Sequence, residues 1–406
     1  MVKQASLAWD LASIVGPENA APGTPAYAVD GLAPKSVVRP RTYEEVCGVI
    51  RYANAGRLAV IPLGGHLHAA LGNLPERYDL ALDVSRLNQV VEFEPADLTI
   101  TCQAGITLGA LRQATGAAGM VVPFDPALPN GATVGGVLAS ALTGLARMSL
   151  GAPRDFTIGL RVVTADGRLT RAGGKVVKNV AGYDLCKLYI GSLGSLGVIV
   201  EATFKTVPLP KSERLLAFEF NDPASACALV SRAVHAGLAV RSASLVREAG
   251  RWRLDPSLAG MAAAVERSVR DLDKWSGQEA LPTPAGAGEG PGVGVPAPLI
   301  AKLSVLPNRL SALVAEAPTH AGIQAHPATG LCRLSFPEAT AEAIAQVRAF
   351  AARFGGTCII ERCPPDLKRG IDVFGDAPPS LALMRAVKAE FDPNRVLSPG
   401  RFVGRL

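Results

Sequence analysis

The chain has 406 residues, of which 49% are hydrophobic and 19% are charged, so disorder is excluded as its main state. This length predicts two or three domains, each able to bury a sizeable core. The formal net charge is +6, but Lys and Arg are scattered and no run of five basic residues occurs. We therefore expect a solvated surface and no nucleic-acid partner.

The cysteines and the hydropathy of the chain indicate the cellular compartment in which it is expected. The seven cysteines have no C-x-x-C spacing, so neither a disulfide framework nor a metal site built by this chain alone, zinc or iron–sulfur, is expected. The N-terminus lacks the apolar stretch of a signal peptide. The most apolar segments, 133–148 and 189–204, are too short and too interrupted by Gly, Ser and Thr to span a bilayer. We expect a cytoplasmic location.

The first part of the chain predicts a small α/β subdomain. A β-prone run at 36–39 is followed by Thr42-x-x-Glu45. This is a capping box, in which the Thr hydroxyl and the Glu carboxylate satisfy the first free amides of a helix that reaches about residue 55. An apolar strand at 58–63 then runs into a glycine-rich loop at 64–72.

A second α/β block is predicted to follow. Strands are expected at 80–84, 98–104 and 198–207, and Thr107 is expected to cap a helix. The segment 160–171 carries Asp166-Gly167 between two apolar runs, which is a strong hairpin signal because both residues tolerate positive φ.

The composition and the predicted pattern of helices and strands change from about residue 212. Alanine-rich helices are expected at 223–236 and 256–275, because each opens with Asp followed by Pro, a capping residue before one that needs no amide partner. Short strands are expected at 215–220, 299–305 and 331–336, and further helices at 338–354 and 380–391 flank a strand at 358–362.

The segment 281–298 differs from its surroundings in composition. It holds five Gly and five Pro in eighteen positions. Such a segment cannot bury enough apolar surface to form a core, so we expect a flexible insertion or linker.

The common fingerprints of nucleotide and hydrolase sites are missing. No G-x-G-x-x-G follows a strand, and no G-x-x-x-x-G-K-[ST], G-x-S-x-G or H-E-x-x-H occurs. A Rossmann site, a P-loop, a serine hydrolase and a zinc peptidase are therefore not indicated.

Three glycine-bearing segments remain as candidates. The backbone amides of 62–72 can form a nest for a phosphate, although such a loop is also an ordinary turn. The small residues of 123–154 allow the backbone to lie against a large planar or phosphorylated ligand, or alternatively form a tightly packed helix. The segment 173–199 mixes Lys, Asn, Tyr and Asp among glycines, which favours a site over simple packing.

These three segments, in this order, resemble the FAD-binding domain of the vanillyl-alcohol oxidase/p-cresol methylhydroxylase (PCMH) type. VKNVAGYDL at 177–185, GSLGSLGVI at 191–199 and FDPNRVLSPGRF at 391–402 resemble the FAD-binding E subunits of bacterial glycolate oxidases. The resemblance covers most of 30–210 and 350–406, and it is weaker between them.

The resemblance implies an α+β fold and FAD as the cofactor. Residues 30–210 would form a PCMH-type FAD-binding domain of two α/β subdomains, with the flavin extended between them. Residues 211–350 would form a smaller α+β cap over the isoalloxazine ring, and 351–406 would return to the FAD-binding domain.

The same resemblance implies which residues contact each part of FAD. The pyrophosphate would be held by Pro62, Gly64, Gly65, His66, Leu67, His68 and Gly72. The ribityl chain and the ring would be lined by Pro123, Thr133, Gly135 and Gly136. Val198 and Ile199 would flank the adenine or the sheet beneath it. Near the ring would lie Lys178, Asn179, Gly182, Tyr183, Asp184 and Arg401, with Tyr183 and Lys178 as the candidate catalytic residues.

Three positions depart from the family pattern. Leu67 stands where a small hydroxyl residue is usual, and Ser398 stands where Asn is usual. His66 falls where some relatives attach the flavin through Gly-Gly-His, so a covalent bond at His66 is a hypothesis. A trypsin digest that yields no flavin-bearing peptide containing His66 would contradict the hypothesis of a covalent bond.

The oxidising chemistry is less clear from the sequence than the flavin site. Oxidation of a 2-hydroxy acid needs a base for the hydroxyl proton and a cation for the carboxylate. The second half has only His235, His320 and His326, and each is expected to be a surface or packing residue.

The resemblance implies an FAD-binding subunit of a glycolate (2-hydroxy acid) oxidase complex that forms glyoxylate from glycolate. Its partners would be a catalytic flavoprotein subunit and an iron–sulfur subunit, through which it would associate with the membrane. Two alternatives stay open: a stand-alone FAD-dependent oxidoreductase acting on another hydroxy acid or alcohol, and a structural subunit that binds FAD weakly.

Overall fold

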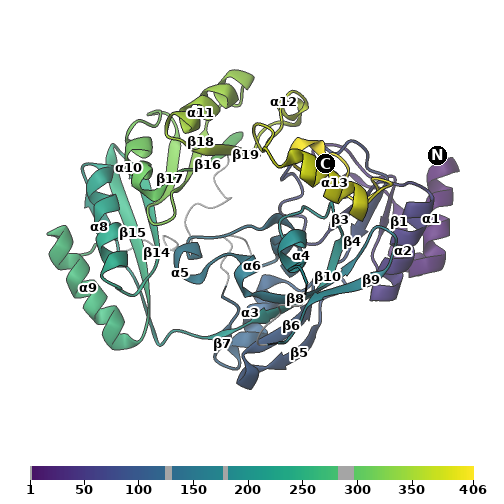
Figure 1. Cartoon of the computed structure of the whole chain (residues 1–406), viewed down its shortest axis with the longest axis horizontal. Helices are drawn as coiled ribbons and strands as arrows, with labels where there is room; N and C mark the ends of the chain where they lie inside the picture. The colour runs from purple at the N-terminus through teal and green to yellow at the C-terminus, as the bar shows by residue number, and fades with distance from the viewer. Residues whose placement is uncertain (1, 124–129, 177–181, 282–296) are drawn as a thin grey trace.

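The computed structural model describes residues 2–123, 130–176, 182–281 and 297–406. Figure 1 shows two lobes side by side. The N-terminal lobe holds the first two sheets, and the helices of the chain's C-terminal segment lie against it. The second lobe, the cap lobe, holds one large sheet with its helices. The expected insertion at 281–298 falls almost wholly outside the described residues.

The first sheet is the small α/β subdomain that the sequence predicts. Its strands lie in the order β1 (Ala20–Pro22), β2 (Ser36–Val38), β4 (Leu80–Asp83) and β3 (Val60–Leu63). The last three run parallel, and α1 (Val2–Val15) and α2 (Tyr43–Ala55) accompany the sheet. β1 lies before residue 30, where this domain was expected to begin, and it pairs with β2.

The capping box at the start of α2 is confirmed in its main part. Thr42 Oγ1 accepts the N–H of Glu45 at 3.1 Å. The Glu45 carboxylate accepts the N–H of Arg41 at 2.6 Å, one residue before the position that the motif predicts. Val46, Ile50 and their neighbours then pack into the core that lies between α2 and the sheet.

The second sheet of the N-terminal lobe is antiparallel throughout. Its order is β5 (Val90–Glu94), β6 (Thr99–Gln103), β10 (Val198–Lys205), β8 (Thr157–Val163) and β9 (Leu169–Gly173). The predicted hairpin is the β8–β9 pair, with Asp166-Gly167 at its turn and Gly167 at φ +77°. Phe204 and Ile100 are fully buried in its core.

Short elements complete this lobe. Thr107 caps α3 as predicted, by accepting the N–H of Ala110 at 3.2 Å. The remaining helices and strands of the lobe have these bounds: α3 (Leu108–Gly116), β7 (Met120–Val121), α4 (Val134–Ser140), α5 (Arg147–Leu150), α6 (Pro153–Phe156), α7 (Cys186–Tyr189) and β11 (Val207–Pro208).

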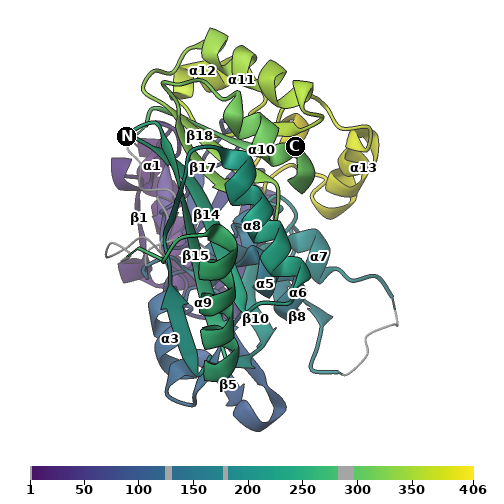
Figure 2. The ribbon, with the colours of Figure 1, turned by 90° about the vertical axis from the view of Figure 1, so that its left-hand side faces the viewer.

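The cap lobe is built on an antiparallel sheet of eight strands. Its order is β12 (Ser212–Leu215), β15 (Arg251–Gly260), β14 (Val240–Glu248), β17 (Gly322–His326), β18 (Leu331–Phe336), β16 (Leu299–Ser304) and β19 (Thr357–Arg362), with β13 (Phe218–Phe220) also on β15. The helices that pack on it are α8 (Pro223–His235), α9 (Ala262–Ser276), α10 (Pro307–Ala315) and α11 (Ala341–Arg353). Figure 2 shows α8 and α9 lying over the outer face of β14 and β15.

One predicted helix is partly wrong. A helix was expected over 256–275, but 251–260 form β15 and the helix begins at Ala262. Asp255 does not cap a helix: its buried carboxylate accepts the Arg253 Nε–H at 3.0 Å. Pro256 lies opposite the break between β12 and β13, where a strand tolerates the loss of one N–H donor.

The C-terminal segment returns to the N-terminal lobe, as Figure 1 shows. It contains α12 (Pro365–Arg369) and α13 (Leu381–Phe391), and Leu397 forms a parallel bridge with Val60 of β3. The boundary expected at residue 350 lies inside α11. The return begins only after β19, because β19 pairs with β16 in the cap sheet.

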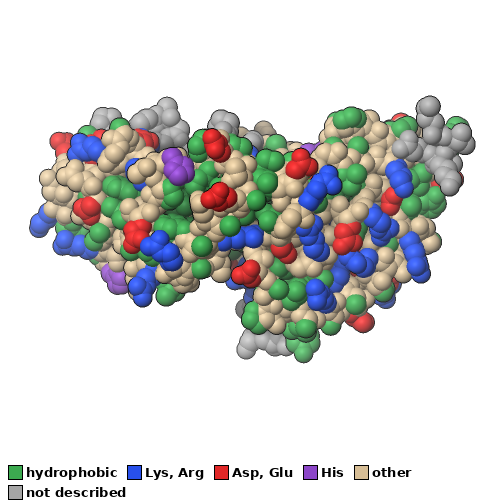
Figure 3. Space-filling model, turned by 90° about the horizontal axis from the view of Figure 1, so that it is seen from above, with side chains coloured by type: hydrophobic (Ala, Val, Ile, Leu, Met, Phe, Trp, Pro, Cys, Tyr) green, Lys and Arg blue, Asp and Glu red, His purple; other side chains and the backbone are tan. Residues whose placement is uncertain are grey.

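Surface features add two observations. On the face seen from above in Figure 3, Lys and Arg side chains are interspersed with Asp and Glu side chains. Within the described parts of the chain, no helix combines the length and the apolar character needed to cross a membrane.

A buried ion pair fixes the last turn of α13. Lys388 Nζ lies 2.6 Å from Asp392 Oδ2 and donates to the carbonyls of Ser195 and Leu397. Asp392 is fully buried and also accepts the N–H groups of Val396 and Leu397. The pair therefore ties the C-terminal segment to the N-terminal lobe.

We expect Asp392→Asn to lower the free energy of unfolding by about 3–5 kcal/mol, because it leaves the buried Lys388 ammonium without its counter-charge. Asp366→Asn removes the exposed pair with Arg369 and should change it by less than about 1 kcal/mol. Urea unfolding of both variants measures the two effects, and equal stabilities would contradict the role given to Lys388 and Asp392.

Candidate functional site

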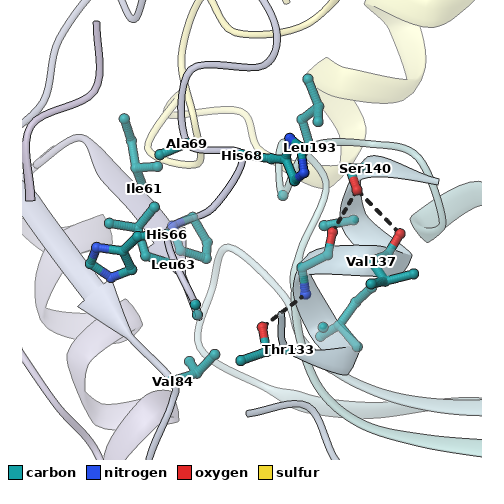
Figure 4. Close-up of a pocket in the computed structure, with 18 of the residues that line it drawn as sticks. Ile61, Leu63, His66, His68, Ala69, Val84, Thr133, Val137, Ser140 and Leu193 are labelled. Carbon is teal, nitrogen blue, oxygen red and sulfur yellow. Dashed lines mark hydrogen bonds between the residues drawn. The ribbon is translucent and has the colours of Figure 1, made fainter. Parts of the chain in front are cut away.

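A cavity opens in the N-terminal lobe between the end of β3 and α4 (Figure 4). One wall is the loop that follows β3, and the opposite wall is the segment that begins α4. The first cavity, as we name it, is lined by residues 61–69, Val84, Ala132, Thr133, Gly135, Gly136, Val137, Ala139, Ser140, Leu193, Gly194, Gly197, Val198, Ile199 and Arg401.

Glycine is required where the loop meets the opposite wall. A Cβ atom on Gly64 would lie 2.1 Å from Thr133 Oγ1, and one on Gly65 would lie 2.7 Å from the Gly131 carbonyl oxygen. Neither distance is tolerated between non-bonded atoms, so the backbone of the two segments approaches closely only because both residues lack a side chain. This close approach closes one end of the first cavity.

The loop presents a row of backbone donors. The N–H groups of Gly64, Gly65, His66, Leu67 and His68 have no acceptor among the residues that the structure describes. Consecutive unpaired amides that border a cavity form a nest for an anion such as a phosphate. The loop therefore has the chemistry that the pyrophosphate of FAD requires.

The opposite wall is held by local hydrogen bonds. Thr133 Oγ1 accepts the N–H of Gly136 at 3.3 Å, and Ser140 Oγ donates to the Gly136 carbonyl at 2.7 Å. Both bonds are drawn in Figure 4. The segment forms a packed helix of small residues, and the same residues line the first cavity.

The two loop histidines point to opposite sides (Figure 4). The His66 ring lies edge-on against the Tyr27 ring, with 4.6 Å between the centroids. The His68 ring lies toward Leu193 and Ser140. His66 has a φ of +58°, which turns the chain within the loop and separates the two rings.

Two buried cations hold the chain that follows the loop. Lys368 of α12 donates to both carboxylate oxygens of Asp30, at 2.9 and 3.0 Å, and to the carbonyls of Ala70 and Gly72. Arg401 donates to the carbonyls of Ala69 and Leu71, and its Nη1 lies 3.6 Å from Asp30 Oδ2. We name Asp30, Lys368 and Arg401 the clamp.

Burial acts against the two cations of the clamp, and the Asp30 carboxylate lies beside both of them. Burial lowers the pKa of Lys368, and the Asp30 carboxylate opposes that shift. Burial lowers the pKa of Arg401 to about 10, so Arg401 remains a cation at neutral pH. The two cations bind four successive carbonyls from residue 69 to residue 72, and this fixes the loop from its far end.

Gly72 shows how closely the C-terminal segment approaches. A Cβ atom on Gly72 would lie 2.7 Å from the Arg401 carbonyl oxygen, and its φ is +96°. The adjacent Asn73 donates to Asp372 Oδ1 at 3.0 Å and to the Phe402 carbonyl at 2.9 Å. Gly72 thus serves the contact with the C-terminal segment and does not line the first cavity.

A second cavity of about 290 Å³ lies between this loop and the cap sheet. Leu67 and His68 line both cavities, so the two are adjacent. The second cavity is lined by Leu67, His68, Ala70, Leu71, Leu142, 246–248, Ile300, 322–324, Arg333, Ser335, 361–363 and Lys368.

Polar side chains of the cap sheet form a row, of which Gln324, Arg333 and Glu361 line this cavity and Lys302 does not. Gln324, Arg333 and Lys302 are neighbours on three adjacent strands, because Gln324 pairs with Arg333 and Arg333 pairs with Lys302. Glu361 accepts from Arg333 Nε at 2.9 Å, and Lys302 Nζ lies 3.7 Å from Glu361 Oε1. Two cations therefore surround one carboxylate.

The charges at this row are set by burial and by one another. Burial alone would raise the pKa of Glu361, but Arg333 and Lys302 outweigh it and hold that pKa below its usual range. Burial also lowers the pKa of Lys302, which Glu361 opposes. Gln324 Oε1 is buried without a hydrogen-bond partner in the described part of the chain. The row has the composition of a site for a small carboxylate.

The structure brings most of the predicted cofactor residues together. The first cavity is lined by Pro62, Gly64, Gly65, His66, Leu67, His68, Thr133, Gly135, Gly136, Val198, Ile199 and Arg401. Their individual contacts with FAD remain predictions. Pro123 is buried but does not line this cavity.

The residues predicted near the flavin ring are placed differently. Gly182, Tyr183 and Asp184 are exposed ahead of α7, and none of them lines either cavity. Tyr183 is 95% exposed, and Asp184 pairs with Lys187 at 3.2 Å. Lys178 and Asn179 lie outside the described residues, so their predicted roles stay open.

Sequence reasoning named Arg401 but missed Asp30 and Lys368 of the clamp, and it missed the polar row. Asp30 and Lys368 are separated by 338 residues, and no local pattern marks either one. Arg333 and Glu361 carry no motif, although each lies on a strand that the sequence predicts. In the described ranges, no group of three or more His, Cys, Asp or Glu is arranged to hold a metal ion, and all seven cysteines are free thiols.

Two families match parts of the chain. Residues 34–173 match the FAD binding domain family, and residues 375–402 match the C-terminal domain of FAD linked oxidases. Each match covers a part of the chain, and together they indicate FAD as the cofactor. The first match includes the loop that follows β3 and helix α4, and the second match includes Arg401.

Curated relatives match between 34% and 51% of this chain. Over 214 residues the chain is 34% identical to glycolate oxidase subunit GlcD of Bacillus subtilis. This match covers 51% of this chain and 46% of that protein. The chain is 39% identical over 184 residues to a D-2-hydroxyglutarate dehydrogenase of Xanthomonas citri, covering 45% and 39%. It is 40% identical over 141 residues to glycolate oxidase subunit GlcE of Escherichia coli, covering 34% and 40%. The matches span less than half the length of each relative.

A solved structure has the same fold. Alkyldihydroxyacetonephosphate synthase superposes with a TM-score of 0.69 at 18% identity, over 90% of this chain and 77% of that one. This confirms the predicted α+β fold.

We expect Lys368→Met to weaken FAD binding by at least tenfold, about 1.4 kcal/mol, because the loop amides lose the support of the clamp. Arg369→Met is the matched control, since Arg369 is the next residue of α12 and its pair with Asp366 is exposed. Titration of the FAD-free protein with FAD measures both. A Lys368→Met variant that binds FAD as tightly as the control would contradict the role of the clamp.

Proposed function

We propose that this chain is an FAD-dependent oxidoreductase of small 2-hydroxy acids and works as the FAD-binding subunit of a glycolate oxidase complex. One observation carries the proposal: a cavity with the donors for a pyrophosphate shares Leu67 and His68 with a cavity that holds a cationic row. Cofactor and carboxylate substrate would then meet at this shared wall. The relatives named as glycolate oxidase subunits and hydroxy acid dehydrogenases support the substrate class.

The first cavity would hold FAD through this chain's backbone. The free amides of residues 64–68 would bind the pyrophosphate, and the clamp would keep those amides in place. Bound FAD supplies the hydride acceptor for oxidation of a CH–OH group. The small residues of α4 would allow the cofactor to lie close to the backbone.

The second cavity would hold the substrate carboxylate. Arg333 would bind it, because its guanidinium already faces the cavity and Glu361 fixes its orientation at 2.9 Å. Lys302 lies on the adjacent strand and keeps the row positive overall. A volume of about 290 Å³ suits a small acid better than a polymer.

The proposed partners are a catalytic flavoprotein subunit and an iron–sulfur subunit. GlcD and GlcE are both named as subunits of glycolate oxidase, and this chain resembles a part of each. Copurification of the tagged chain from its native cells, followed by flavin and iron analysis, tests this part. Recovery of the chain alone would contradict it.

A stand-alone oxidoreductase remains the second candidate. It is favoured by the adjacency of the two cavities within this chain, since Leu67 and His68 line both of them. The hydroxy acid would then be chosen by the row on the cap sheet. Turnover of the isolated chain with an artificial electron acceptor, without partner subunits, would favour this candidate.

We expect the purified chain to show a flavin absorption band that bleaches when a 2-hydroxy acid is added without oxygen. Glycolate, D-lactate and D-2-hydroxyglutarate form the test panel, and bleaching by one of them locates the oxidation on this chain. A band that stays oxidised with all three would overturn the proposed activity. Absence of the band would favour a structural subunit.

A pair of variants locates the substrate. Arg333→Gln should raise the acid concentration for half-maximal bleaching by about 10- to 100-fold, as expected for the loss of a charged hydrogen bond. Arg267→Gln on α9, whose side chain is exposed, should leave that concentration unchanged. Equal behaviour of the two variants would place the substrate elsewhere.

A further inference from the structure

Neither the proposed FAD site nor the row on the cap sheet alone accounts for where the His68 side chain lies. Its backbone belongs to the loop that follows β3, while its ring lies at the wall between the two cavities. In Figure 4 the ring points away from His66 and toward Leu193. Leu67, the other shared residue, is apolar, so His68 is the polar group of the shared wall.

The His68 ring has an unused nitrogen. Nε2 is buried and has no hydrogen-bond partner within the described residues. A buried polar atom left without a partner costs about 1–3 kcal/mol, so such an atom at a cavity wall is suited to a ligand. The two cavities that it borders are where such a ligand would lie.

The groups that face His68 come from the cap sheet. Glu361 and Arg362 lie on β19, and Arg333 lies on β18. Burial lowers the pKa of His68, Glu361 raises it, and the two arginines lower it further. The imidazole is therefore neutral at neutral pH and can accept a proton.

We propose that His68 accepts the hydroxyl proton of a 2-hydroxy acid bound in the second cavity. This role rests on the proposed function, and it goes beyond binding of the carboxylate by Arg333. Bound FAD would supply the acceptor for the hydrogen that leaves the C–H bond of the substrate with its electron pair. The O–H proton passes to His68 Nε2, and the carbon–oxygen single bond becomes the carbonyl of the 2-oxo acid.

Other candidate bases fit less well. His326 is 5% exposed with a pKa lowered to about 3 by burial, and it does not line the second cavity. Tyr183 is 95% exposed and lines neither cavity. Lys368 lines the second cavity, but its ammonium is engaged by Asp30 and two carbonyls.

The first test needs no turnover. The imidazole signals of the FAD-loaded protein are followed by NMR against pH, with and without saturating oxalate, and His68 is assigned by comparison with His68→Gln. We expect a His68 pKa below the ordinary value of about 6.5 that rises when oxalate binds, because a nearby anion favours the imidazolium. The exposed His235 on α8 is the internal control and should not respond.

Kinetics give the second test. His68→Gln should keep the flavin band, but its reduction per bound FAD by the hydroxy acid that bleaches the wild type should slow at least about 100-fold. The loss of rate toward low pH, where the wild-type imidazole is protonated, should disappear in this variant. His235→Gln should reduce at the wild-type rate.

The outcomes separate this inference from the proposed function. If no 2-hydroxy acid bleaches the wild-type flavin, the proposed function fails, and the NMR titration still decides whether His68 faces the anion. If the wild type is bleached but His68→Gln is reduced equally fast, the role of His68 is overturned. A His68 signal that ignores oxalate overturns it as well.

Discussion

Everything at the candidate site depends on how the loop after β3 is held. Residues 64–68 line the first cavity, and their N–H groups have no acceptor among the residues that the structure describes. The loop is fixed through its carbonyls instead, because Lys368 and Arg401 bind those of residues 69–72. The Asp30 carboxylate balances the two buried cations. The N–H groups of residues 64–68 therefore remain available to a ligand, while the carbonyls of residues 69–72 are bound by the clamp.

The clamp also gives a physical reason for the path of the chain. Its two cations belong to the C-terminal segment, and its carboxylate belongs to the segment ahead of β2. The chain leaves the cap sheet after β19 and then forms α12, which brings Lys368 into hydrogen-bonding contact with the Ala70 carbonyl. The same segment places Arg362, Cys363 and Lys368 at the second cavity. One connection thus supports the cofactor loop and closes the proposed substrate site.

The sequence predicted the local structure well where its causes are local, because the Thr42 cap and the Asp166-Gly167 hairpin follow from residues adjacent in the chain. The residues of the first cavity were predicted from the family resemblance instead, since the close approaches of Gly64 to Thr133 and of Gly65 to Gly131 are tertiary contacts. Pro256 was misread because a cap and a strand interior share the Asp-Pro pair, and only the break between β12 and β13 separates them. The clamp and the Arg333–Glu361 pair depend on tertiary contacts that no local pattern encodes.

The most direct test of this account is the crystal structure of the chain grown with FAD. The account predicts the pyrophosphate against the amides of residues 64–68 and the isoalloxazine ring next to His68, where the two cavities meet. A pyrophosphate bound away from this loop, or a ring directed away from the second cavity, would contradict it.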